Sequence, residues 1–95
     1  MKPVPELDSL LLSAARLPIM AFLKKNPIGE FTQIRDELNW QAGNLSLQIK
    51  KLKEAGYVDI QKSFKGNYPL TSVLLTEKGE TAIKEFHKMV NDLLS

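Results

Sequence analysis

The order of apolar and polar residues along the chain has the period of a helix in five segments and of a strand in two. The first segment predicts a helix over about residues 6–13, whose apolar side chains share one side: Leu7, Leu10 and Leu11. A second helix is expected after Ser13, whose hydroxyl can cap it, with Pro18 near its first turn, where a missing amide hydrogen is tolerated. The sequence Asn26-Pro27-Ile28-Gly29 should end this helix in a turn.

Two short helices in the middle of the chain predict a helix-turn-helix over about residues 30–55. The sequence FTQIRDEL places apolar residues on one side, and Asn39 can adopt the left-handed conformation that ends a helix. Trp40, expected to plug the turn, and Gln41 separate it from a helix over residues 42–55, which Gly56 can stop. In such a pair the second helix is normally the one that reads a nucleic acid.

The helix over residues 42–55 has one narrow apolar face, which consists of Leu45, Ile49 and Leu52 and is expected to point to the core. The opposite side carries a mixed set of residues: Gly43, Leu47, Lys50 and Glu54. The flanks are polar or basic, with Asn44, Ser46, Lys51 and Lys53. A basic helix with an outward leucine therefore needs an explanation beyond core packing.

A hairpin and a closing helix follow. Strands are predicted over residues 57–62 and 70–75 with a turn over 65–69, which together form a wing over about residues 57–75. Thr76 is a suitable N-cap for a helix over about residues 77–94, although Gly79 stands where a capping box would have glutamate. The apolar face of this helix is long: Ile83, Phe86, His87, Val90, Leu93 and Leu94.

Composition limits the possible functions. The length of 95 residues suits a single domain over residues 1–95, and the absence of cysteine excludes disulfides, thiolate metal sites and a cysteine nucleophile. The net charge is only +2, but residues 41–70 hold five lysines against two acids. No signal-peptide core and no membrane-spanning stretch is present, and a cytoplasmic location is expected.

Catalytic and metal-binding chemistry is not expected. His87 is the single histidine and has no second ligand at metal-binding spacing, so a packed or interface histidine is the favoured interpretation. Asp36 and Glu37 have no nucleophile or acid partner in view, and there is no phosphate-binding glycine loop. We therefore expect no enzyme, no metal and no cofactor.

Several motifs occur together in a specific order: Arg16-Leu17 with Ile19-Met20, then GNLS at residues 43–46, LxxAGYV at 52–58, FxGxxPxT at 64–71 and LTxKG at 75–79. With them the chain resembles, over about residues 8–86, the small prokaryotic winged-helix transcriptional regulators related to the MarR and ArsR families. The resemblance implies an α+β, mainly α fold, a winged helix-turn-helix with a two-stranded β wing and a C-terminal dimerisation helix. It also implies a DNA-binding regulator.

The predicted partner is double-stranded DNA, whose major groove admits a helix. Lysines would neutralise phosphates, Leu47 could touch a thymine methyl, and the wing tip would contact the backbone. The predicted DNA-binding residues are Gly43, Asn44, Ser46, Leu47, Lys50, Lys51, Lys53, Lys62, Lys65, Asn67 and Tyr68. The simpler interpretations are a solvated lysine face and a scattered surface leucine.

The two ends of the chain predict a homodimer, because they offer more apolar surface than a small monomer is expected to expose. The predicted interface residues are Leu7, Leu10, Leu11, Phe86, Val90, Leu93 and Leu94. The expected function is sequence-specific DNA binding by a dimeric transcriptional regulator, with repression as the expected mode. The alternative is a winged-helix module that binds protein in a larger assembly. The sequence shows no obvious sensor site, and whether an effector binds, for example between the dimer helices, stays open.

Overall fold

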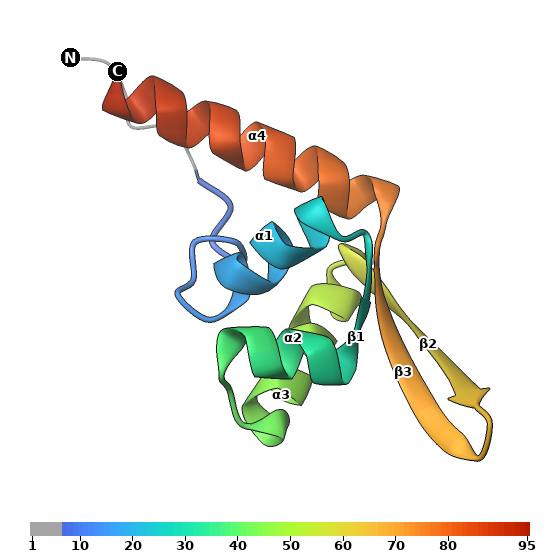
Figure 1. Cartoon of the computed structure of the whole chain (residues 1–95). Helices are drawn as coiled ribbons and strands as arrows, with labels where there is room; N and C mark the ends of the chain where they lie inside the picture. Colours follow the sequence, from blue (N-terminus) through green and yellow to red (C-terminus); the bar gives the residue numbers. More distant parts are fainter. Residues whose placement is uncertain (1–6) are drawn as a thin grey trace.

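The computed structural model describes residues 7–95 as a mainly helical protein with a small antiparallel sheet (Figure 1). The elements in this part of the chain are α1 (Arg16–Lys25), β1 (Ile28–Glu30), α2 (Phe31–Leu38), α3 (Ala42–Glu54), β2 (Val58–Lys65), β3 (Tyr68–Leu75) and α4 (Glu77–Leu94). Helix α1 lies between α4 and the pair α2–α3, and the β2–β3 hairpin projects away from the helices (Figure 1). The predicted winged helix-turn-helix is confirmed.

The core joins all of these helices to the sheet. Its fully buried side chains come from the segment before α1, from α1, α2 and α3, and from both hairpin strands: Leu11, Ile19, Met20, Leu23, Ile34, Leu45, Leu52, Val58 and Val73. Ile49 and Phe86 are nearly as buried. Trp40 is partly buried against this cluster, as expected for a residue that closes the turn. The predicted inward face of α3 is confirmed.

The helix predicted over residues 6–13 is wrong within the described residues, where residues 7–15 form no helix and turn at 9–11 and at 14–15. The Asp8 side chain accepts a hydrogen bond from the backbone N–H of Leu10, and its carbonyl accepts from Leu11 and Leu12. Such local bonds compete with helix propagation. Apolar spacing alone therefore gave a false helix, although Leu11 does enter the core.

Helix α1 begins and ends close to the predicted positions. The Ser13 hydroxyl accepts from the backbone N–H groups of Ala15 and Arg16, at 3.2 and 3.1 Å, which supports its predicted capping role. Pro18 lies in the first turn, where a backbone N–H would have no acceptor within the helix, so its absence costs no helical hydrogen bond. The helix stops at Lys25, before Asn26-Pro27.

A third strand, β1, occupies part of the stretch predicted as a turn. It pairs antiparallel with β3, with Gly29 opposite Val73, and the sheet order is β1-β3-β2. Three residues are too few to show the alternation of apolar and polar residues that predicts a strand. In addition, the apolar Ile28 is exposed while Gly29 is buried, the reverse of the burial that their hydrophobicity suggests. The strand therefore depends on its β3 partner.

The helix-turn-helix closes as predicted. Asn39 has φ 53° and ψ 48°, the left-handed conformation that ends α2, and the Trp40 N–H donates to the carbonyl of Arg35 at 3.1 Å. Helix α3 then begins after Gln41 and ends before Gly56, whose φ is 82°. The predicted stop at this glycine is confirmed.

The wing spans the predicted residues, but its two strands are longer and its turn is tighter than predicted. Lys65 pairs with Tyr68, so Gly66-Asn67 alone forms the connection rather than residues 65–69. Pro69 lies inside β3 opposite Phe64. Since this distal part of the hairpin extends beyond the core, every residue from 61 to 69 is exposed.

Helix α4 starts at Thr76, whose hydroxyl accepts the backbone N–H of Gly79 at 3.0 Å, so the predicted cap is confirmed. A Cβ atom at Gly79 would collide with the carbonyl oxygen of Tyr57 and approach Leu75 Cδ1 at 2.9 Å. This close approach explains why glycine, rather than the glutamate of a capping box, stands three residues after Thr76. Within residues 7–95, no helix has the length and apolarity needed to cross a membrane.

Candidate nucleic-acid interface

The outer side of α3 is open to solvent. Leu47 keeps 50% of its surface exposed, and a Cβ atom added at Gly43 would meet nothing within 4 Å. The other predicted contact residues of this helix are exposed as well: Asn44, Ser46, Lys50, Lys51 and Lys53. Gln48, on the side of α3 nearer the core, is buried at 8% exposure. The helix thus presents one continuous outward surface, which no described residue covers.

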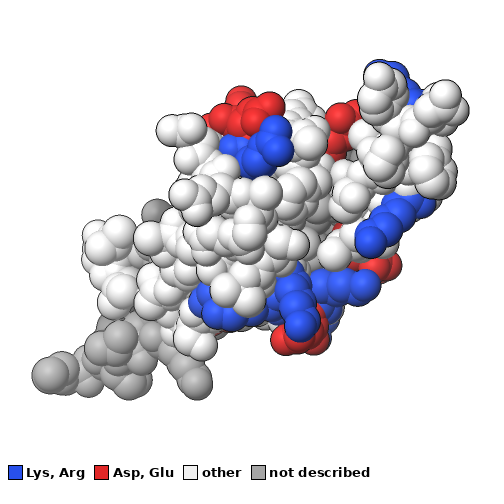
Figure 2. Space-filling model, turned by 90° about the horizontal axis from the view of Figure 1, so that it is seen from below, with Lys and Arg blue, Asp and Glu red and all other residues white. Residues whose placement is uncertain are grey.

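The lysines on this surface have no acidic partner among residues 7–95. Ion pairs in this range join Arg35 to Asp36 and Lys84 to Glu80. Figure 2 views the molecule from below and shows basic side chains along its lower edge and at its right, around a largely uncharged middle, with acidic groups next to them at both places. Unneutralised ammonium groups around an uncharged centre suit a polyanion.

The first turn of α3 also has free hydrogen-bond donors. The Gln41 side chain makes no capping bond, and the first amide of this region with an intrahelical bond is that of Leu45, which donates to the Gln41 carbonyl at 3.1 Å. The N–H groups of residues 42–44 have no acceptor within the described part of the chain. Such groups at a helix N-terminus can bind a phosphate oxygen.

A shallow groove of about 620 Å³ separates α3 from the wing. Its wall includes two lysines and the exposed leucine of α3 together with a side chain of β2: Ser46, Leu47, Lys50, Lys53, Glu54 and Ile60. Glu54 is the acidic member of this set. The groove joins the open side of α3 to the hairpin, so the two could contact one extended ligand.

The wing places its predicted contact residues in solvent. Lys62, Lys65 and Asn67 are exposed, and Tyr68 keeps 78% of its surface exposed at the hairpin tip. Phe64 is 75% exposed and was not among the predicted contacts. It pairs with Pro69, two residues from the turn, in the part of the hairpin that extends beyond the core, and the sequence pattern carries no signal of that extension.

The predicted dimer residues divide into two groups. Leu11 and Phe86 belong to the core of this chain, and Leu7, Leu10 and Val90 are partly buried against that core. Leu93 and Leu94, in contrast, are exposed by 44% and 80% at the far end of α4. The remaining exposed apolar groups near these ends are Leu12 and Met89, and His87 is exposed on the same helix.

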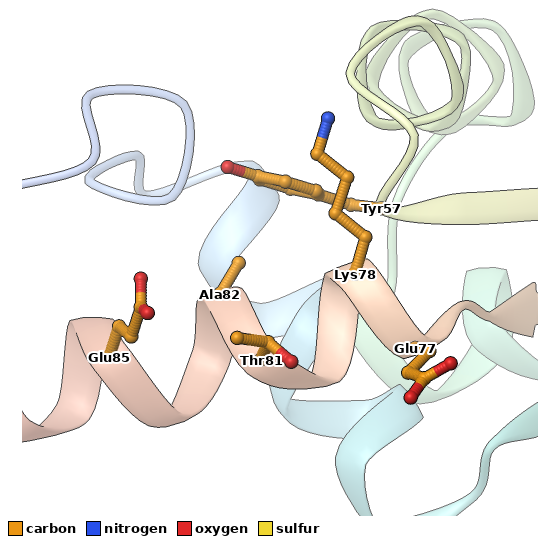
Figure 3. A pocket seen from close by; sticks show the side chains of 6 residues that line it. All are labelled: Tyr57, Glu77, Lys78, Thr81, Ala82 and Glu85. Carbon is orange, nitrogen blue, oxygen red and sulfur yellow. The ribbon is translucent and has the colours of Figure 1, made fainter.

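A second hollow, of about 470 Å³, lies between Tyr57 and α4 (Figure 3). The Lys78 ammonium lies 5.9 Å from the centre of the Tyr57 ring, and Ala82 faces the ring from the next turn of α4. Glu77, Thr81 and Glu85 complete the wall. Two carboxylates and one ammonium define no single ligand chemistry here. The described residues hold no cluster of three metal-binding side chains.

A helix-turn-helix with an open second helix, a hairpin beside it and a long closing helix defines the winged-helix class of proteins. Residues 15–94 match the family model described as "Winged helix DNA-binding domain", and the chain belongs to this family. It is 35% identical over 74 residues to an uncharacterized protein of Methanocaldococcus jannaschii, which covers 78% of this chain and 80% of that protein. The resemblance found in the sequence motifs is therefore confirmed.

Solved structures agree with this assignment. The transcriptional regulator homologue protein of Pyrococcus horikoshii superimposes with a TM-score of 0.86 and 30% identity, covering 92% of this chain and 86% of that one. A mutant MarR of E. coli in complex with operator DNA has a TM-score of 0.74 and 20% identity, covering 85% of this chain and 58% of that one. A MarR transcriptional regulator from Methanosarcina mazei has a TM-score of 0.71 and 21% identity over 90% and 58%. The chain thus shares the winged-helix fold of these transcriptional regulators.

Proposed function

We propose that this protein is a dimeric transcriptional repressor that binds a specific operator by placing α3 in the major groove of double-stranded DNA. The observation that carries the proposal is the outward side of α3, where Lys50, Lys51 and Lys53 surround Leu47 without an acidic partner in the described chain. A solvated lysine face alone would not need an exposed leucine at its centre. The MarR structure bound to operator DNA has the same fold, which supports this use of the helix.

In the proposed complex the side chains have separate roles. Lysines of α3 and of the wing, Lys62 and Lys65, contact phosphates, and contacts of this kind supply most non-specific affinity. Gly43 allows close approach of the backbone, and Leu47 meets a thymine methyl group. Asn44 and Ser46, near the start of α3, reach base edges or phosphates. Asn67 and Tyr68 contact the sugar-phosphate backbone from the wing tip.

Two chains are needed for operator recognition. A two-fold dimer places its two reading helices about one DNA turn apart, roughly 34–36 Å, in successive major grooves on one face of the duplex. The exposed Leu93 and Leu94 at the end of α4 and Leu12 before α1 supply apolar surface for that contact. Occupation of an operator by such a dimer would block access to a promoter, which is the basis for proposing repression.

The direct test measures affinity for random duplex DNA at a series of salt concentrations, followed by selection of bound DNA from a random pool. The proposal expects log affinity to fall with log salt by about 0.9 per phosphate contacted, and the selected pool to hold two related half-sites. Absence of duplex binding even at low salt would overturn it. That result would favour the protein-binding alternative, in which Leu47, Phe64 and Tyr68 meet another protein.

A further inference from the structure

A chain of hydrogen bonds connects the segment before α1 to the outward side of α3. Arg16 Nε donates to the carbonyl of Leu10 at 2.7 Å, and a terminal nitrogen of the same guanidinium donates to Gln48 Oε1 at 2.9 Å. Gln48 Nε2 then donates to Asn44 Oδ1 at 3.2 Å. Gln48 is nearly buried whereas Asn44 is exposed, so this series of hydrogen bonds runs from the interior to the proposed DNA surface.

The chemistry of the three side chains determines which atom donates and which accepts in each of these hydrogen bonds. The arginine guanidinium carries donors and no acceptor, so the atom of Gln48 that faces it must be the carbonyl oxygen. The amide nitrogen of Gln48 therefore faces Asn44 and must find an acceptor there. Asn44 meets this need with its own oxygen, which leaves its NH2 group turned away from Gln48. No acceptor for that NH2 group occurs among residues 7–95.

We propose that Arg16 and Gln48 are positioning residues that set the side-chain amide of Asn44 with its NH2 group outward, so that α3 presents a hydrogen-bond donor at this position. The inference rests on the proposed function and adds a base preference to it. Guanine offers two acceptors, O6 and N7, in the major groove. Adenine is best read by asparagine through both amide atoms, one of which is already engaged with Gln48. The contacted position should therefore favour guanine over adenine.

A purely structural role for the same bonds predicts a different behaviour. If Arg16 and Gln48 only satisfied one another at the edge of the core, a change that keeps them paired would leave base preference unaltered. Gln48→Glu is such a change, because glutamate can still accept from Arg16 and adds a favourable charge pair. It differs in offering an oxygen, rather than an NH2 group, to Asn44. Asn44 would then turn its NH2 group inward and present its oxygen to the DNA.

The first experiment uses the full chain without DNA and follows hydrogen exchange of the side-chain amides by NMR. In the wild type the NH2 protons of Gln48 should exchange slowly and those of Asn44 rapidly. In Gln48→Glu the Asn44 protons should become the slow ones. Slow exchange of the Asn44 amide in the wild type would overturn the inference, whether or not the protein binds DNA.

The second experiment selects bound duplexes from a random pool with the wild type, Gln48→Glu and Gln61→Glu. Gln61 is exposed on β2, so its replacement adds the same charge away from Asn44. Gln48→Glu should shift the guanine-to-adenine ratio at one position of each half-site by about fivefold or more, the low end for a base contact, whereas Gln61→Glu should leave it unchanged. A selected motif that weakens uniformly in Gln48→Glu, with every base preference retained, would overturn the inference.

The two experiments separate this inference from the proposed function. If the amide exchange pattern is as expected but the wild type selects no DNA, the proposed function fails, and the base preference fails with it while the amide orientation stands. If the wild type selects a motif but the ratio does not move, DNA binding stands and the positioning role of Arg16 and Gln48 fails.

Discussion

The hydroxyl of Tyr57 donates a hydrogen bond to the carboxylate of Asp8, which ties the segment before α1 to the start of β2. Asp8 also accepts the N–H of Leu10, and the carbonyl of Leu10 in turn accepts from Arg16. The same segment buries Leu11 in the core. These contacts hold a non-helical stretch against the domain where regular helix would otherwise be expected from its leucines.

The contact between Asp8 and Tyr57 predicts a pH dependence. The hydrogen bond to Asp8, together with burial and the negative charges of Asp8 and Glu85, raises the pKa of Tyr57 from its ordinary value of 10.0 to about 12. Because the folded protein holds this proton more tightly than the unfolded chain, the contact stabilises fully below pH 10 and its contribution is lost as the pH rises toward 12.

Ultraviolet titration of tyrosinate measures this pKa. The titration is carried out in a Tyr68→Phe variant, in which Tyr57 is the single remaining tyrosine. Asp8→Asn should lower the pKa of Tyr57, because the charge is removed and the amide is a weaker acceptor. The same substitution should also reduce the alkaline loss of stability. An unchanged Tyr57 pKa in Asp8→Asn would mean that the contact does not persist in solution.

Two glycine-to-alanine substitutions should have opposite effects on stability. Gly43→Ala adds a methyl group in open space on a helix and should raise the free energy of unfolding by up to about 1 kcal/mol. Gly79→Ala forces a Cβ atom onto the Tyr57 carbonyl and should lower it by about 1–3 kcal/mol. Chemical denaturation measures both, and each variant serves as the control for the other.

The stabilised Gly43→Ala variant should nevertheless bind duplex DNA more weakly, because its methyl group stands between the α3 backbone and the phosphates. Affinity for random duplex at fixed salt measures this effect. Retention of full affinity in a variant that is at least as stable as the wild type would show that no close backbone approach occurs at this position.

Removal of two lysines from α3 should flatten the salt dependence of DNA binding. Lys50→Ala with Lys51→Ala is expected to reduce the slope of log affinity against log salt by about 1.8, since each phosphate contact contributes about 0.9. The matched control, Lys84→Ala with Lys88→Ala on α4, removes the same charge far from the proposed surface. Equal slopes for the two double variants would indicate a net-charge effect without a defined contact.

If the end of α4 forms the dimer interface, substitutions there should reduce the particle mass from that of a dimer to that of a monomer. Leu93→Glu with Leu94→Glu places charges on two exposed apolar side chains, which should separate the dimer into monomers without disturbing the core. Sedimentation equilibrium measures the particle mass, and Leu47→Glu, which alters an exposed leucine of α3, is the control. Wild-type and double-variant particles of equal mass would contradict an interface at these residues.

Part of the candidate site could be predicted from sequence and part could not. The inward and outward sides of α3 followed from a 100° rotation per residue, which needs no knowledge of neighbouring elements. The role of Arg16 could not be predicted, because its contact with Gln48 joins residues 32 positions apart. Phe64 was missed for a similar reason, since its exposure depends on how far the hairpin extends beyond the core.

The sequence by itself determined the helix ends at Asn39 and Gly56, the cap at Thr76 and the apolar seam of α3, because each depends on backbone preferences or on spacing within one element. Tertiary structure alone decided that residues 7–15 are held against the domain, that residues 28–30 form a strand on β3, and that position 79 must be glycine. Each of these depends on a partner distant in sequence: Tyr57 for Asp8 and for Gly79, and β3 for β1. A local pattern carries no information about such partners until the chain has folded.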